Sequence, residues 1–245
     1  MMAGILLYPL SIVPVILIYI WIKKKIISDD EHIEICRQAL FNGAKALGPV
    51  LLLGALFSII ELILKFADVS RIFMIFYHNF FVLALAEELS KAYMLKRLFT
   101  KYPIGYSWLD IVVFLQIIAI GFDILESLLY SIGASVPIVI VRGLTFPHLG
   151  YGLLMGYWGG KAVRSRNRLY YIPAIVLPWL IHGMYDFCLS PEILDLYESI
   201  ALFAVLIAFL DIVLVIIMVI FVLKARKKAK YTEIILEAGF IYKNT

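Results

Sequence analysis

Charged residues are scarce in this chain. They make up 16% of its 245 residues, against about 25% in an ordinary soluble domain. Apolar residues make up 63%, and the mean hydropathy is +0.96. A chain with so few polar side chains cannot cover its surface in water. We therefore exclude a soluble, a disordered and a collagen-like protein, and predict that the chain lies in a lipid bilayer.

Cysteine is also rare, with two residues in the whole chain. Cys36 lies in a charged segment and Cys188 in an apolar one, so we expect both to remain thiols and exclude a disulfide scaffold. The first apolar run lacks a preceding basic residue and a small-x-small cleavage site, and Lys23, Lys24 and Lys25 follow it directly. It is therefore predicted to be a retained anchor and not a cleaved signal peptide.

Long apolar runs dominate what is present. A spanning helix needs about 20 mostly apolar residues, and seven stretches meet this requirement, at about 4–22, 46–64, 72–95, 108–131, 137–158, 172–190 and 199–223. Only helices and closed barrels span lipid, and these runs are too long for barrel strands. The predicted fold class is all-α, a polytopic helical bundle with about seven transmembrane helices.

Basic residues are distributed asymmetrically between the predicted loops. Of the 22 Lys and Arg residues, 18 follow the first, third, fifth and seventh spans, while Lys65 and Arg71 lie on the opposite side. Because basic loops stay in the cytoplasm, this bias predicts an N-out, C-in orientation. The same bias explains the net charge of +4, because the basic loops set the topology and contact the lipid bilayer. We therefore expect no nucleic-acid partner.

The predicted spans group into three parts. Residues 1–71 hold two anchor spans, about 4–22 and 46–64, joined by an interfacial segment at 23–45. Residues 72–190 hold four consecutive spans that carry ionisable residues. Residues 191–245 hold the last span and a basic cytosolic tail. The four middle spans are predicted to form the functional core.

Ionisable residues inside the spans need an explanation, because a charge at mid-membrane costs roughly 2.5–3.5 kcal/mol. Isolated ones such as Glu61, His78 and Asp211 are most simply explained by hydrogen bonds and ion pairs between helices. For the others, the spacing favours a common site. The full set comprises Glu61, His78, Glu87, Glu88, Lys91, Asp110, Asp123, Glu126, Arg142, His148, His182, Asp186 and Asp211.

The third span contains two adjacent carboxylates, Glu87 and Glu88, followed by Lys91. Glu87 and Lys91 share a helix face at i and i+4, so the ammonium group can stabilise an ionised carboxylate. Glu88 lies about 100° round the helix. Such a pair suits general-base chemistry, because one carboxylate can accept a proton while the other orients water.

The fifth span carries Arg142 and His148 around Pro147, which is expected to kink the helix. It also carries glycines at four-residue spacing, which we interpret as a surface for close helix contact. In the sixth span, His182 and Asp186 share a face at i and i+4, so the carboxylate can fix the imidazole tautomer. The glycines are Gly152, Gly156 and Gly160.

The fourth span adds Glu126, and with it the acidic residues outnumber the basic ones in the four middle spans. The aromatic residues one turn away on either side, Phe122 and Tyr130, are expected to pack in the core. If the polar groups converge, the surplus negative charge must be met by shared protons or by a divalent cation. Either outcome describes a reactive centre. The acids are Glu87, Glu88, Asp123, Glu126 and Asp186, and the bases are Lys91 and Arg142.

These residues, in this order over about 84–187, resemble the PrsW intramembrane proteases, relatives of the type II CAAX prenyl proteases and the bacteriocin-processing enzymes. The family usually has Asn after the glutamate of the fourth span, where this chain has Ser127 after Glu126. The matching motifs are Glu87-Glu88-x-x-Lys91, Asp110, Gly121-Phe122-x-x-x-Glu126-x-x-x-Tyr130, Arg142 with His148, and His182-Gly183-x-x-Asp186.

The resemblance implies a multi-pass peptidase in the cell membrane of a prokaryote, which cuts a membrane-anchored protein such as a single-span anti-sigma factor. It implies that Glu87 is the general base, that Glu88 and His148 orient the water, and that His182 and Asp186 face the oxyanion. The supporting residues are Lys91, Glu126 and Arg142.

The mechanism has two possible forms, because the family is described both as glutamate-based and as metal-dependent. The chain has no HExxH zinc motif, so the favoured interpretation needs no cofactor. The alternative is Zn²⁺ bound by ligands from Glu87, Glu88, His148 and His182.

Two other functions use buried polar groups of the same kind, namely a non-catalytic membrane scaffold and a proton-coupled transporter. A transporter more often shows an internal repeat, and we find none in this sequence. A scaffold would pair its polar groups separately, whereas an enzyme needs Glu87, Glu88, His148 and His182 around one cavity.

Overall fold

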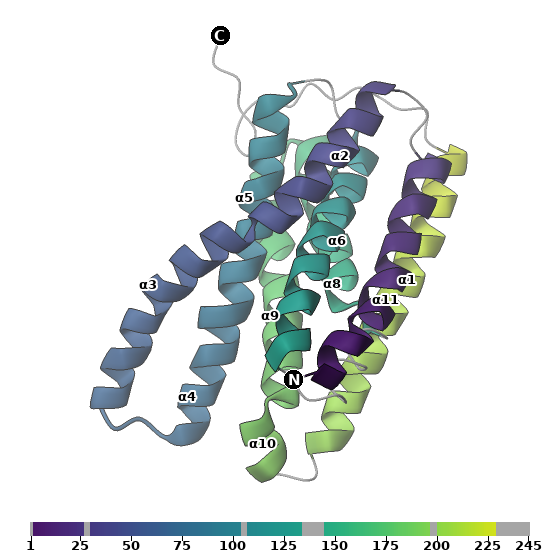
Figure 1. The fold of residues 1–245 in the computed structure, drawn as a ribbon. Coiled ribbons are helices and arrows are strands. Elements are labelled where there is room, and N and C mark those ends of the chain that lie inside the picture. The colour runs from purple at the N-terminus through teal and green to yellow at the C-terminus, as the bar shows by residue number, and fades with distance from the viewer. Residues whose placement is uncertain (1, 27–29, 104–106, 134–144, 197–199, 229–245) are drawn as a thin grey trace.

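The computed structural model describes residues 2–26, 30–103, 107–133, 145–196 and 200–228. Its described elements are all helical, which confirms the predicted all-α class (Figure 1). They are α1 (Met2–Ile26), α2 (Asp30–Lys45), α3 (Leu47–Phe66), α4 (Arg71–Tyr77), the π-helix η1 (His78–Leu85), α5 (Ala86–Lys101), α6 (Trp108–Gly133), α8 (Pro147–Ser165), the 3₁₀ turn η2 (Arg168–Tyr170), α9 (Tyr171–Leu189), α10 (Pro191–Leu196) and α11 (Ile200–Lys228).

Four helical stretches among the described residues are long and apolar enough to cross a membrane. They are Ile33–Phe66, Arg71–Lys101, Trp108–Ile132 and Arg168–Leu189. The protein is therefore an integral membrane protein. The number seven stays a prediction, as does the orientation. Arg142 and residues 137–144 of the predicted span at 137–158 lie outside the described residues.

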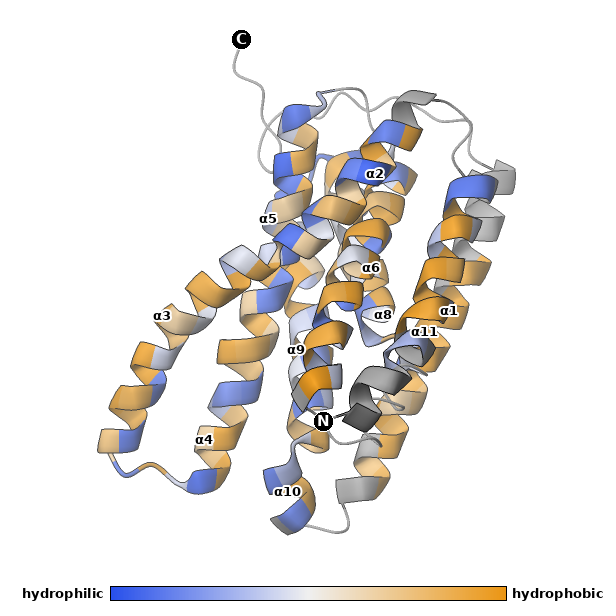
Figure 2. Cartoon of the chain, in the orientation of Figure 1, coloured by the Kyte–Doolittle hydropathy of each residue, from blue (hydrophilic) through white to orange (hydrophobic). Residues whose placement is uncertain are grey.

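Hydrophilic residues occur at both ends of the bundle (Figure 2), and the basic residues are concentrated at one of them. The end with the carboxyl termini of α1, α5 and α8 carries basic residues such as Lys23, Lys101 and Arg164. The α3–α4 connection and α10 lie at the opposite end, together with the start of α1 (Figure 1). This arrangement agrees with the basic-residue bias in the sequence.

The buried α6 lies at the centre of the bundle and contacts α1, α2, α5 and α8. It crosses α2 at two glycines, because a Cβ on Gly43 would overlap the α6 backbone and a Cβ on Gly121 would overlap the carbonyl of Leu40. Ile35 and Cys36 of α2 are fully buried. One face of α2 therefore packs against the core, while Arg37 and Phe41 are exposed. The interfacial position of the segment 23–45 stays a prediction. Neither Cys36 nor Cys188 forms a disulfide with the other described residues, as expected.

The glycines of α8 pack directly on α6. A Cβ on Gly156 would lie 2.7 Å from the Cα of Val112, and one on Gly160 would lie 2.8 Å from the carbonyl oxygen of Trp108. This confirms their predicted structural role. Pro147 does not kink a continuous helix as expected. It is the first residue of α8 and follows Phe146, whose φ of 49° interrupts the helix. A proline fits there because the first turn needs no N–H donor.

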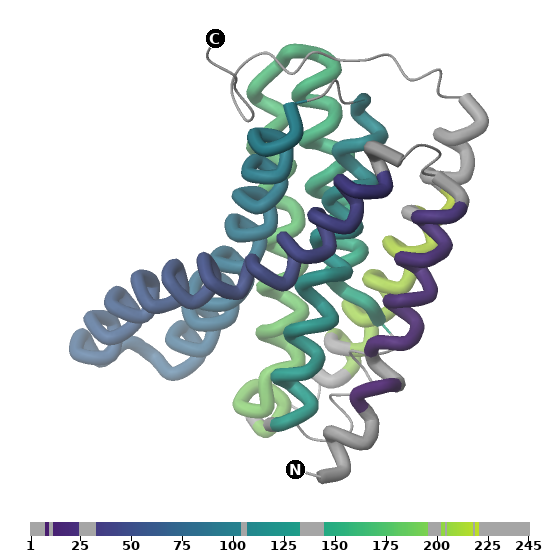
Figure 3. The backbone as a smooth tube through the Cα atoms, turned by 45° about the horizontal axis from the view of Figure 1, so that its top comes forward, coloured from purple at the N-terminus to yellow at the C-terminus, as the bar shows by residue number. Residues whose placement is uncertain are grey.

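The helices α3 and α4 form a hairpin that leans away from the rest of the bundle (Figures 1 and 3). No residue of α3 is buried, and its leucines and isoleucines are widely exposed. In water such a surface would be unfavourable, but it is the composition expected of a helix that faces lipid. The same holds for much of α11.

Candidate active site

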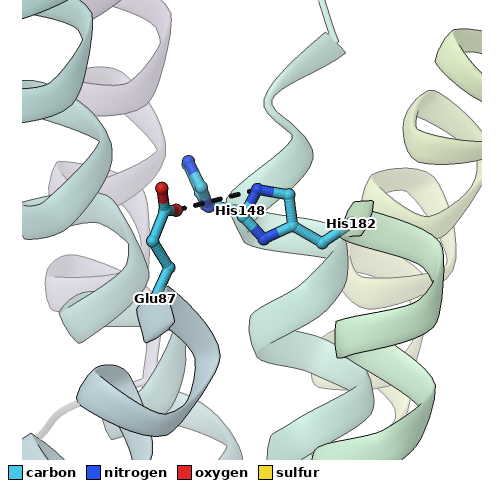
Figure 4. A group of neighbouring side chains, drawn as sticks. All are labelled: Glu87, His148 and His182. Carbon is cyan, nitrogen blue, oxygen red and sulfur yellow. Dashed lines mark ion pairs between the residues drawn. The ribbon is translucent and has the colours of Figure 1, made fainter. Parts of the chain in front are cut away.

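Four helices bring ionisable side chains together in the interior of the bundle. Glu87, Glu88 and Lys91 come from α5, Glu126 from α6, His148 from α8, and His182 with Asp186 from α9. Figure 4 shows Glu87, His148 and His182 pointing toward one another. The site residues, apart from Asp186, are buried in the core, and Asp186 is about 10% exposed at its side chain.

Glu88 and His182 form one half of this centre. The Nδ1 atom of His182 lies 2.8 Å from Oε1 of Glu88, and its Nε2 atom lies 3.2 Å from Oδ2 of Asp186. Carboxylates on both sides of a ring fix its orientation. The predicted pairing of His182 with Asp186 across one helix turn is therefore present.

Glu126, His148 and Lys91 form the other half. Lys91 Nζ lies 2.9 Å from Nδ1 of His148, and His148 Nε2 lies 2.5 Å from Oε2 of Glu126. An ammonium group has no acceptor. Nδ1 of His148 therefore accepts from Lys91, and Nε2 carries the proton that is donated to Glu126. Glu126 thus sets the tautomer of His148.

Lys91 joins the two halves through Glu88, and not through Glu87 as the i, i+4 spacing suggested. Its ammonium nitrogen donates to Oε1 of Glu88 over 2.7 Å. It also lies 5.0 Å from the ring centroid of Phe122, close enough for a cation–π contact. The structure differs from the sequence pattern because Glu87 faces His182 of α9.

Glu87 is left with an unsatisfied carboxylate oxygen. Its Oε2 is buried and has no hydrogen-bond partner among the residues that the structure describes. It lies 3.7 Å from Nε2 of His182. A buried polar atom without a partner is costly. The atom is therefore placed to take up a water molecule, a metal ion or a substrate group.

The centre also has donors suitable for a metal ion. One ligand atom each from Glu87, His148 and His182 lie within 4.8 Å of one another, as do atoms of Asp123, Glu126 and His148. Two imidazoles and a carboxylate are a common ligand set for catalytic zinc. The orphaned Oε2 of Glu87 fits such an ion. His148 would have to exchange its bond to Lys91 or Glu126 for a bond to the metal.

A π-helix precedes Glu87, and sequence reasoning missed it. η1 lies between α4 and α5, and its turns are wider than those of an α-helix. π-helical turns often occur at functional sites. The side chain of Trp179 in α9 donates to the carbonyl of Phe80 over 2.6 Å. The ring of Phe80 lies against Gly183, where an added Cβ would come within 2.6 Å of it. Gly183 of the predicted motif thus allows α9 to approach η1.

We expect Gly183→Ala to lower the free energy of unfolding of the purified protein by about 1–3 kcal/mol, which is the usual destabilisation of an overpacked core. The melting temperature should fall accordingly. The Phe80 ring cannot move freely, because it packs on Phe76 with centroids 4.4 Å apart. Gly159→Ala is the matched control, since its nearest neighbour, Ile111 Cγ2, would be 3.9 Å away. Thermal unfolding in detergent measures both variants. Equal melting temperatures would contradict the close contact.

Tyr151 and Asp211 are two further residues at the centre that the motifs did not include. The ring of Tyr151 stacks on His182, with centroids 4.7 Å apart and an angle of 21° between planes. Its hydroxyl donates to Oδ2 of Asp211 over 3.5 Å. Asp211, fully buried in α11, therefore connects the last helix to His182. Its isolated position in an apolar run was the signal available in the sequence.

Other residues of the predicted set have structural partners elsewhere. Asp110 accepts from the backbone N–H and the hydroxyl of Ser107 at the start of α6, as in a capping box. Glu61 and His78 lie 3.1 Å apart and pair with each other, as expected for contacts between helices. Arg142 lies outside the described residues.

The fold and the centre define a helical integral membrane protein with buried carboxylates and imidazoles at one site. The sequence model of the family described as "PrsW family intramembrane metalloprotease" matches residues 42–224. The chain belongs to this family, as its motifs predicted, and is a membrane-embedded peptidase.

Curated proteins named Protease PrsW are similar to this chain. The one from Clostridioides difficile is 28% identical over 201 residues, 76% of this chain and 80% of the relative. The one from Bacillus subtilis is 29% identical over 182 residues, 71% and 78% of the two chains. The one from Oceanobacillus iheyensis is 31% identical over 121 residues, 47% and 56%. No solved structure matches the chain.

Proposed function

We propose that the protein hydrolyses a peptide bond of a membrane-embedded or membrane-anchored protein, with Glu87 as the general base on water. The observation that carries this proposal is the orphaned Oε2 of Glu87, buried 3.7 Å from Nε2 of His182. A carboxylate oxygen that has no partner of its own accepts a proton from a water molecule in the same space.

The neighbouring residues prepare Glu87 for this step. Oε2 of Glu88 also lacks a hydrogen-bond partner among the described residues, but its Oε1 is bonded to both Lys91 and His182. Glu88 therefore holds His182 in place, and we assign the proton transfer to Glu87. Lys91 supplies positive charge that opposes the build-up of negative charge as water attacks. His148, held between Lys91 and Glu126, forms the opposite wall.

His182 is the donor nearest to Glu87. Its Nε2 faces both Glu87 and Asp186. An N–H at this position can donate to the oxyanion that forms from the carbonyl oxygen of the substrate. Asp186 competes for the same N–H when no substrate is bound. It keeps the ring oriented toward the site until a carbonyl group replaces it.

If a zinc ion is bound, Glu87, His148 and His182 are the residues that hold it, and the ion supplies an activated water and a Lewis acid. Glu88 would still orient His182, and whichever of Lys91 and Glu126 keeps its bond to His148 would still orient that ring.

A scaffold or a proton-coupled transporter is less well supported. The residues form one chain of contacts from Glu126 through His148, Lys91 and Glu88 to His182. Among the described residues, Glu61 and His78 form a separate pair of the kind that a scaffold predicts, and this pair lies outside that chain of contacts.

The test is a cleavage assay in proteoliposomes with a panel of single-span membrane proteins that carry a fluorophore at each end. We expect the wild type to cut at least one of them at a single position, identified by mass spectrometry. Glu34→Gln should cut equally well, because Glu34 bonds to Arg37 and Gln38 of its own helix α2, which contributes no residue to the proposed site. Proton uptake without cleavage of any panel member would favour a transporter instead.

A further inference from the structure

A cleft of about 460 Å³, lined by both apolar and charged side chains, lies beside the proposed catalytic centre. It runs between the α3–α4 hairpin with η1 on one side and the end of α9 with α10 on the other. These elements meet at the end of the bundle that lies away from the basic loops (Figure 1). Its volume falls in the range of about 300–1,000 Å³ typical of ligand pockets.

The cleft borders the proposed site at Asp186. This residue lines the cleft and also lies 3.2 Å from Nε2 of His182. Tyr130, one helical turn beyond Glu126 on the same face of α6, lines it as well. A chain segment in the cleft would therefore reach Asp186 and His182 first, with Glu87 directly behind them.

The wall of the cleft is acidic. Glu61, Asp186 and Glu192 line it, and no Lys or Arg occurs among the described lining residues. The side chains of Glu61 and His78 are 25% and 45% exposed, so their pair borders the cleft and is not sealed in the core. Glu192 at the start of α10 is exposed on the opposite wall.

We propose that this cleft binds the substrate segment next to the scissile bond, and that Glu61 and Glu192 accept a Lys or Arg side chain of that segment. The proposal rests on the peptidase function above. Glu61, which pairs with His78, would then contribute to substrate specificity in addition to this structural contact. A carboxylate of the cleft that faces a cationic side chain of the substrate favours substrate binding. An acidic substrate side chain at the same position would be repelled by the carboxylate and would weaken binding.

The first test uses a cleaved panel protein and versions of it with Lys, Ala or Glu at each of the four positions on either side of the cut. We expect Lys to give a kcat/KM at least about tenfold higher than Glu at one or two positions. Glu61→Lys should invert this ratio. Glu34→Lys, which reverses a charge on α2, is the matched control. An unchanged ratio in Glu61→Lys overturns the proposal.

A second measurement separates failure of this proposal from failure of the peptidase function. A photo-crosslinking residue at Met74, which lines the cleft, is introduced into Glu87→Gln protein. It should capture the juxtamembrane segment of the substrate, whereas the same residue at Leu169, which is exposed and lies outside the cleft, should not. Capture without cleavage by the wild type would refute the peptidase function alone. Equal capture from both positions would refute the cleft as the binding site.

Discussion

Glu87→Gln is expected to abolish cleavage, with a loss of at least about a hundredfold in kcat, because general acid–base catalysis contributes roughly 10²–10⁴-fold. The amide keeps the shape of the carboxyl group and removes the atom that accepts the proton. The melting temperature should change little, because Oε2 of Glu87 makes no hydrogen bond with the described residues. The proteoliposome assay and thermal unfolding of the same preparation measure both quantities.

Glu34→Gln is the control for this variant. It makes the same change in a carboxylate of α2 that bonds to Arg37 and Gln38 of its own helix. It should retain most of the activity. Normal cleavage by Glu87→Gln would show that another group is the base, and Glu88 would then be the first candidate.

Asp186→Asn separates the two forms of the mechanism. In a glutamate-based site, the amide supplies an N–H donor close to the developing oxyanion and no longer competes for Nε2 of His182, 3.2 Å away. Activity should then be retained or rise, because one oxyanion donor is worth about 2.7–4 kcal/mol. We expect this result, together with resistance of the wild type to chelators.

The metal-dependent form makes the opposite prediction. A carboxylate beside a ligand imidazole orients it, and such outer partners typically affect metal affinity or activity 10–100-fold. Asp186→Asn would then lose metal and activity together. The metal content of the purified wild type and of the purified Asp186→Asn variant decides between the glutamate-based and the metal-dependent mechanism. Stoichiometric zinc that disappears with the activity would overturn our expectation, and Glu87, His148 and His182 would be its ligands.

The residues of the buried centre were accessible from the sequence because charge is expensive in lipid, and their order carried the resemblance to the family. A glutamate in a soluble helix carries little information, whereas Glu87, Glu88, Glu126 and Asp186 lie in apolar runs and need partners. Periodicity also placed His182 and Asp186 on one face, and they lie 3.2 Å apart. Local helix geometry alone fixes such a pair.

Contacts between helices were not accessible in this way. The spacing favoured a bond between Glu87 and Lys91, but Lys91 bonds to Glu88 and to His148. Which of two adjacent carboxylates a cation selects depends on the helix that faces it. The sequence likewise gave no sign that Tyr151 would stack on His182 and hold Asp211.

The amino-acid sequence by itself determined the membrane location, the helical class and the residue types of the centre. These follow from composition, from the length of apolar runs and from the cost of charge in lipid. Only the tertiary structure decided that α2 is buried against α6, that a π-helix precedes Glu87, and that Oε2 of Glu87 is left without a partner among the described residues. Each of these depends on the packing of segments far apart in the chain, and hydrophobic patterns do not specify which helices meet.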